Sequence, residues 1–293
     1  MPKNIISVGS LGYPAGTPLE QVLKEIVQAG YQGTPVYPGL GPPEKVKETL
    51  ERFGLKPAPG YQDGRIWLPQ ERSSFLETAR KNAQFERAMG LTEIFIATAG
   101  WGNYTGRRGL NRAQVAGWVS PEDSLTAEEW QVAATTLAEA CRIYQEEGVS
   151  PCFHSHVGSV VETLDEIERL LTEMPPDLLY LGPDTGHLAF AGIDPVEFFR
   201  KYASLIRAVH LKDVLEAVRT RGAAEHWDYD TFIRQEIYTE LGRGNVNFER
   251  IFDILKQVGY SGALVVETDA PSVPTMLESN TLSRQYLRKL LGY

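Results

Sequence analysis

The chain has 293 residues, of which 42% are hydrophobic and 23% charged, and its formal net charge is −9. This composition is that of a folded globular protein and excludes disordered and collagen-like chains, while the surplus of acidic residues argues against a surface that binds nucleic acid. No apolar run reaches the ~20 residues of a membrane span, and two cysteines, Cys141 and Cys152, are too few for a disulfide framework. The amino terminus has one basic residue and no long apolar stretch, so we expect no secretion signal and predict a cytoplasmic protein.

Strand and helix patterns alternate along the chain. Short apolar runs bounded by turn residues predict eight buried parallel strands, at residues 5–10, 34–37, 57–61, 93–97, 151–153, 178–182, 206–211 and 263–266. Amphipathic segments between them predict helices, for example at residues 18–29, 43–53, 75–89, 127–147 and 248–258. Such alternation is typical of a parallel sheet.

Glycines mark the ends of helices in these repeating units. A glycine follows several of the predicted helical patterns, where it tolerates the left-handed conformation that ends a helix. These glycines are Gly30, Gly54, Gly90, Gly148 and Gly259. Eight strand–helix units in 293 residues predict an α/β protein, a single (β/α)8 TIM-barrel domain over residues 1–293. An open doubly wound sheet is the alternative, but no G-x-G-x-x-G motif follows the first strand.

Reactive side chains lie at the ends of the last four predicted strands. In chain order they are His154 and His156, Asp184 and His187, His210 and Lys212, and Glu267. A TIM barrel gathers the carboxyl ends of its strands on one face, where its active site lies, so we expect these side chains to converge. Histidine and carboxylate ligands together suit a divalent metal ion such as Mn²⁺, Co²⁺ or Zn²⁺, and the carboxylates also accept Mg²⁺.

Some of these residues have simpler interpretations. Asp184 is also placed to cap the turn that follows it, and Lys212 with Asp213 also fits a solvated loop pair. His154 and His156 lie two residues apart, so both can share one face and either is a candidate ligand.

Three further side chains lie outside this series. Trp101 comes just after the fourth predicted strand and is a candidate for contact with a substrate. Arg243 lies between two glycines, a motif too short to predict a phosphate site, although its charge suits an anion. His226 lies in a polar stretch that we interpret as a loop.

Three stretches carry a resemblance to a known family. They are residues 154–163 (HSHVGSVVET), 184–195 (DTGHLAFAGIDP) and 210–214 (HLKDV), continued in order by residues 242–248, 259–262 and Glu267. In these stretches the chain resembles the xylose-isomerase-like barrel superfamily of sugar isomerases, epimerases and related lyases, and within it the inosose dehydratase branch. The similarity runs through much of the chain and is densest from residue 127 onward.

The resemblance implies a divalent metal ion held by Asp184, His210 and Glu267, with a fourth ligand after the fifth strand. In the epimerases of the family that ligand is a glutamate, and two metal-bound carboxylates exchange the substrate proton. Here the position corresponds to His154, which counts against a two-base epimerase and agrees with the dehydratase branch. The first half of the barrel departs from that branch, because residues 11–14 (LGYP) and 97–100 (ATAG) replace its usual polar segment and glutamate.

We therefore predict an enzyme, a metal-dependent lyase or sugar isomerase, that acts on a small polyhydroxy ketone, sugar or cyclitol through an enediolate. Candidate bases are Glu267, His156 and Lys212, and candidate acids are His187 and Lys212. The side chains predicted to contact the substrate are His156, His187, Trp101 and Arg243.

This dehydratase has three alternative functions as competitors. A sugar isomerase or epimerase with the same metal site is the main alternative. A metal-dependent nuclease of the same barrel class is disfavoured by the acidic charge, and a barrel without turnover by the complete ligand set. We expect no nucleic acid or membrane partner, and analogy with the superfamily favours a homo-oligomer.

Overall fold

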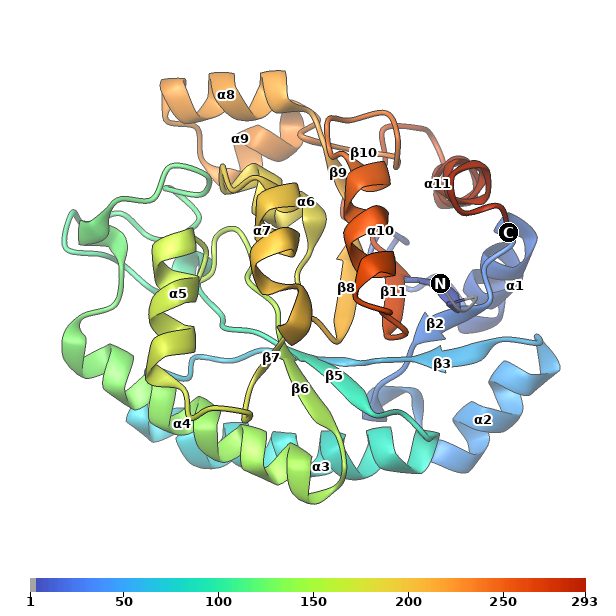
Figure 1. The fold of residues 1–293 in the computed structure, drawn as a ribbon, viewed down its shortest axis with the longest axis horizontal. Coiled ribbons are helices and arrows are strands. Elements are labelled where there is room, and N and C mark those ends of the chain that lie inside the picture. The colour runs from blue at the N-terminus through green and yellow to red at the C-terminus, as the bar shows by residue number, and fades with distance from the viewer. Residues whose placement is uncertain (1–3) are drawn as a thin grey trace.

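Parallel strands form the inner layer of the fold and helices surround them in the computed structural model (Figure 1), which describes residues 4–293. Residues 1–3, part of the segment for which no secretion signal is expected, lie outside the described residues. One sheet has the order β3 (Lys56–Ala58), β2 (Gly33–Pro35), β1 (Ile6–Val8), β11 (Ala263–Val266), β8 (Ala208–Leu211). The other has the order β4 (Tyr61–Gln62), β5 (Glu93–Ile96), β6 (Ser150–Phe153), β7 (Tyr180–Leu181).

The two sheets join into the predicted barrel at two seams. At the first, the predicted strand at residues 57–61 is interrupted between β3 and β4. Pro59 has no N–H for the ladder, and the N–H of Gly60 donates instead to Glu86 Oε1 at 3.2 Å. At the second seam, Arg207 N–H donates to Leu181 O and His210 N–H donates to Pro183 O, each at 3.0 Å, which links β7 to β8.

Helices cover the outside of the strands. The predicted helices are confirmed with small changes of boundary as α1 (Leu19–Ala29), α2 (Pro43–Arg52), α3 (Arg72–Met89), α4 (Ala127–Glu146) and α10 (Phe248–Gln257). The glycines that were expected to end helices all have positive φ, between 67° and 91°. The structure adds α5 (Leu164–Glu173), α6 (Thr185–Phe190), α7 (Pro195–Tyr202) and α11 (Met276–Leu291), and α11 packs against α1. Among residues 4–293, no helix combines the length and apolar character needed to cross a membrane.

An excursion between β8 and α10 was not predicted. In it, β9 (Asp213–Val214) pairs antiparallel with β10 (Tyr238–Thr239), and α8 (Glu216–Glu225) and α9 (Tyr229–Arg234) lie between them in the chain, at the upper edge of Figure 1. His226 is exposed and ends α8 with a φ of 56°, so it takes no part in a buried site.

The solvated-loop interpretation of Lys212 and Asp213 is wrong, because both side chains are buried. The Asp213 carboxylate accepts backbone N–H groups from Val214, Gly242, Gly244 and Val246, at 2.9–3.0 Å. One carboxylate therefore joins the start of the excursion to its end. The four N–H donors also stabilise the buried charge of this carboxylate, which would be unfavourable without hydrogen bonds.

Candidate active site and metal centre

Ligand-type side chains converge at the carboxyl ends of four neighbouring barrel strands. His154 follows β6, Asp184 follows β7 and His210 lies in β8, and one ligand atom from each lies within 4.8 Å of the others. Glu267 follows β11, and its Oε2 atom is 2.9 Å from His210 Nδ1. The structure thus brings together the four residues that were predicted as metal ligands.

The two carboxylate oxygens of Asp184 have different surroundings. Its Oδ1 atom accepts the N–H groups of Gly186 at 2.7 Å and His187 at 2.9 Å and so caps α6, as the simpler interpretation predicts. Its Oδ2 atom is fully buried without a hydrogen-bond partner. Burial raises the pKa of Asp184. The Lys212 ammonium forms an ion pair with this oxygen at 3.3 Å. A buried carboxylate oxygen that makes no hydrogen bond and faces other ligand atoms fits a cation site.

The two histidines of this set also have ring nitrogens available for a metal ion. His154 Nδ1 is 3.2 Å from the carbonyl oxygen of Gly182, so an N–H there donates to that carbonyl and Nε2 keeps its lone pair. His210 Nδ1 lies 2.9 Å from Glu267 Oε2 and has no other partner at hydrogen-bond distance among the described residues. Burial holds the pKa of His154 well below its usual range, and a neutral imidazole is the form that binds metal. This donor set therefore fits a divalent ion.

Lys212 brings a buried positive charge to the same place. Its Nζ atom donates to both oxygens of Asp269, at 2.8 and 2.9 Å, and is 3.0 Å from His187 Nε2. Burial opposes the charge, but the carboxylates of Asp184, Asp269 and Glu267 hold the pKa of Lys212 well above its usual range. The side chain is therefore an ammonium, which donates hydrogen bonds and accepts none.

His187 is held in one tautomer by two neighbours. Because the Lys212 ammonium can only donate, His187 Nε2 accepts, and the proton lies on Nδ1, 3.2 Å from the hydroxyl oxygen of Tyr238. Burial holds the pKa of His187 well below its usual range. Tyr238 comes from β10, and Asp269 lies two residues beyond Glu267. Neither was singled out from the sequence, although the alternation of faces along a strand was a signal for Asp269.

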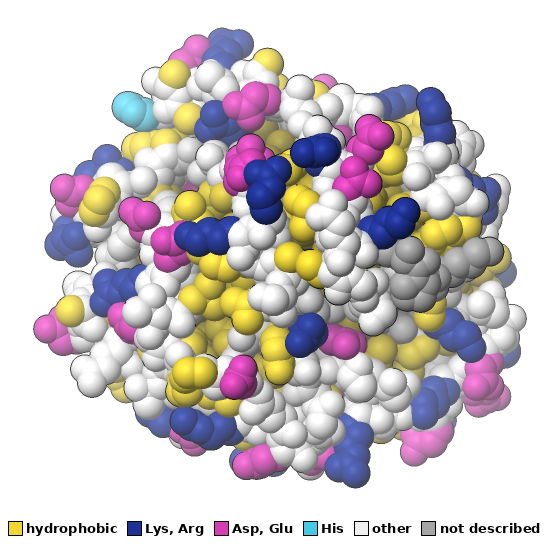
Figure 2. Space-filling view, viewed as in Figure 1, with side chains coloured by type: hydrophobic (Ala, Val, Ile, Leu, Met, Phe, Trp, Pro, Cys, Tyr) yellow, Lys and Arg dark blue, Asp and Glu magenta, His cyan; other side chains and the backbone are white. Residues whose placement is uncertain are grey.

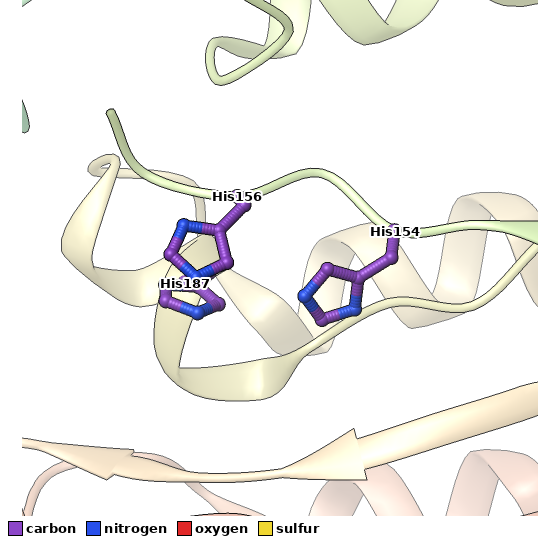
Figure 3. Close-up of side chains that lie close together, drawn as sticks. All are labelled: His154, His156 and His187. Carbon is purple, nitrogen blue, oxygen red and sulfur yellow. The ribbon is translucent and has the colours of Figure 1, made fainter. Parts of the chain in front are cut away.

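His156 and Trp101 form one wall of the site. Figure 3 shows His154 and His156 on the same segment, with the His156 ring beside His187, and the centroids of these two rings are 3.6 Å apart. The Trp101 ring lies 4.9 Å from His156, and its backbone φ of 42° is unusual for a residue with a side chain. Burial lowers the pKa of His156 to about 4, so this ring is neutral at pH 7.

His154 and His156, the two candidate ligands that follow β6, lie in different surroundings. His154 belongs to the cluster with Asp184 and His210, whereas the cluster that contains His156 consists of His154, His156 and His187. His156 Nδ1 is 2.7 Å from the carbonyl oxygen of Val157. This placement favours His154 over His156 as the partner of Asp184.

Arg243 is not brought into this cluster by its described contacts. Its side chain is 49% exposed and approaches Glu240 Oε2 at 3.4 Å, so contact with a substrate stays a prediction. A cavity of about 780 Å³ lies elsewhere, with apolar walls between α5 and α7 that are visible in Figure 2, and none of the clustered residues lines it. The residues suited to metal binding therefore lie outside this cavity, at the carboxyl ends of the strands.

Comparison with known proteins defines the family. The profile of the xylose isomerase-like TIM barrel family matches residues 23–290. The inosose dehydratase of Geobacillus kaustophilus (strain HTA426) is 30% identical over 94% of this chain and 88% of its own length. The rhizopine catabolism protein MocC of Rhizobium meliloti is 33% identical over 86% of this chain and 75% of its own length. The chain therefore belongs to the xylose isomerase-like TIM barrel family.

Solved structures support the same fold. The 3-keto-D-glucoside 4-epimerase YcjR from E. coli superposes with a TM-score of 0.72 and 17% identity, over 98% of this chain and all of that one. The IOLI protein with a bound zinc atom superposes with a TM-score of 0.70 and 13% identity, over 98% of each chain. These structures show the fold alone, and the inosose dehydratases among the sequence relatives support an enzyme of the lyase class.

Proposed function

We propose that this chain is a divalent-metal-dependent dehydratase that removes water from an inosose-like polyhydroxy ketone. The observation that carries the proposal is the convergence of His154, Asp184, His210 and Glu267, with Asp184 Oδ2 buried and without a hydrogen bond. The inosose dehydratase of G. kaustophilus, matched over 88% of its length, supports the choice of substrate.

These four residues would hold the ion, and the whole chain would act as one barrel domain. When bound, a divalent ion acts as a Lewis acid on a carbonyl oxygen and stabilises the negative charge that develops on it. Mn²⁺, Co²⁺, Zn²⁺ and Mg²⁺ are all compatible with two nitrogen and two carboxylate ligands.

The remaining side chains would carry the proton transfers. A base removes the proton from the carbon next to the ketone, and His156, neutral at pH 7, and Glu267 are the candidates. The hydroxyl on the next carbon then leaves as water while a carbon–carbon double bond forms. Its proton would come from the Lys212 ammonium, with His187 hydrogen-bonded to it as a relay.

The alternative is an isomerase or epimerase with the same metal site. A two-base epimerase needs a proton acceptor on each face of the substrate, and the set here has a histidine, His154, in place of one of the two carboxylates. Removal of one proton followed by loss of the protonated hydroxyl as water needs one base and one acid, so the dehydratase agrees better with this set of residues.

The test is product analysis with the metal-loaded protein. Bound metal is removed from the protein with a chelator, and the protein is reloaded with Mn²⁺ or Co²⁺ and incubated with inosose in deuterated water. We expect a product that has lost one water, with the absorption of a conjugated ketone, and no activity after chelation. Solvent deuterium in an otherwise intact ketone would instead establish the isomerase, and a metal-loaded protein that leaves inosose and related ketones unchanged would refute both.

A further inference from the structure

The Lys212 ammonium lies between two sets of carboxylates. On one side are Asp184 Oδ2 at 3.3 Å and Glu267 Oε2 at 3.4 Å, which belong to the proposed metal ligands. On the other side is Asp269, whose two oxygens accept from Nζ at 2.8 and 2.9 Å. We propose that Asp269 is a positioning residue that holds the Lys212 ammonium off the metal-binding oxygens. This inference rests on the metal site of the proposed function.

Hydrogen-bond alignment distinguishes the two sides. Nζ makes aligned hydrogen bonds to Asp269 and His187, whereas Asp184 Oδ2 has no hydrogen-bond partner despite its proximity. These three hydrogen bonds match the three N–H groups of the ammonium, and all of them point away from the ligand oxygens of Asp184 and Glu267.

The stem of Lys212 allows little other movement. A Cβ atom on Gly186 would lie 2.6–2.9 Å from the Cβ, Cγ and Cδ atoms of Lys212, so helix α6 packs directly against this stem. The Lys212 side chain is 1% exposed. A change of partner is therefore confined to the end of the side chain, where Asp269, Asp184 and Glu267 all lie within 3.4 Å of Nζ.

Charge decides what happens when Asp269 is neutralised. A buried ammonium without a counter-ion is strongly unfavourable, and the other nearby carboxylates are those of Asp184 and Glu267. Lys212 would then pair with the same oxygens that a divalent ion needs, and the two cations would compete. With Asp269 present, each cation has its own carboxylate.

The experiment is a titration of the metal-free protein with Mn²⁺ by calorimetry, repeated with Co²⁺ by visible absorption, on wild type and four variants. We expect Asp269→Asn to weaken Mn²⁺ binding about 10–100-fold, the usual effect of losing a group that supports metal ligands. We expect Lys212→Met to bind at least as tightly as wild type. The double variant should recover most of the loss, with a coupling of about tenfold, or roughly 1.4 kcal/mol. Asp269→Glu keeps the negative charge and should bind close to wild type.

Several results would overturn the inference. One is an Asp269→Asn protein that binds Mn²⁺ as wild type does. Another is strict additivity, in which Lys212→Met raises the affinity equally in both backgrounds, because Asp269 would then act only through its own charge. Thermal unfolding of the metal-free variants controls for folding, and loss of folding in Asp269→Asn with weak binding in the folded Asp269→Glu variant would also refute it. No substrate is used, so inactivity on inosose with intact metal coupling would refute only the dehydratase, and a wild-type chain that binds no ion would refute the metal site itself.

Discussion

Asp184 gives the sharpest test of the site, because its two oxygens separate a structural task from a chemical one. Oδ1 accepts the backbone N–H groups at the start of α6, and Oδ2 is buried without a hydrogen bond. Asp184→Asn keeps the capping oxygen and replaces the other oxygen with an amide NH₂ that cannot bind a cation. Asp184→Ala removes both. The pair of variants therefore distinguishes capping from metal binding.

The expected magnitudes follow from these contacts. Loss of an N-cap costs about 1 kcal/mol, which for a chain of this size is a fall of roughly 2 °C in the Tm of metal-free Asp184→Ala. Metal-free Asp184→Asn should stay close to wild type. An ion at 100 times its Kd should stabilise wild type by about 2.7 kcal/mol, a rise of roughly 5 °C in Tm, and should leave both variants unchanged.

The assay is differential scanning calorimetry with and without Mn²⁺, and Mg²⁺ and Ca²⁺ serve as comparison ions. Two results would refute the reasoning. If Mn²⁺ raises the Tm of Asp184→Asn as much as that of wild type, Oδ2 is not a ligand. If metal-free Asp184→Asn loses as much stability as Asp184→Ala, Oδ1 is not the cap that matters.

Three further predictions concern Trp101 and Tyr238 near the site and the buried acid Glu86. Trp101→Ala should raise KM for the ketone about 10-fold through loss of aromatic contact, with unchanged Mn²⁺ affinity; an unchanged KM would remove Trp101 from the substrate wall. Tyr238→Phe should lower kcat about 5-fold, the value of one neutral hydrogen bond of roughly 1 kcal/mol to His187, again without effect on Mn²⁺ affinity, and weaker metal binding would contradict this role. Burial raises the pKa of Glu86 well above its usual value, and only one of its oxygens is hydrogen-bonded, to Gly60. The folded state then binds more protons than the unfolded state above about pH 4.5, so stability falls as pH rises, by at most about 1.4 kcal/mol per pH unit. In urea unfolding at pH 5, 7 and 9, Glu86→Gln should remove this decline, and an identical pH profile in the two proteins would show that Glu86 is not its source.

Much of the barrel follows from local patterns. An apolar run needs only its own residues to favour a buried strand, and a glycine such as Gly30 or Gly90 ends a helix through its own backbone freedom. The interruption at Gly60 was not predicted, because it depends on an acceptor, Glu86, from another part of the chain. The excursion with Tyr238 was missed for a similar reason, since strands as short as β9 and β10 have too few residues to show a period.

The sequence by itself determined which strand ends carry His, Asp and Glu, and therefore that these groups meet at one face of a parallel barrel. Only the tertiary structure decided how each side chain points. It places His154 rather than His156 with Asp184, pairs Lys212 with Asp269, and leaves Arg243 half-exposed beside Glu240. The physical reason is that local periodicity locates each strand along the chain, whereas side-chain direction depends on partners that are tens of residues away in the chain.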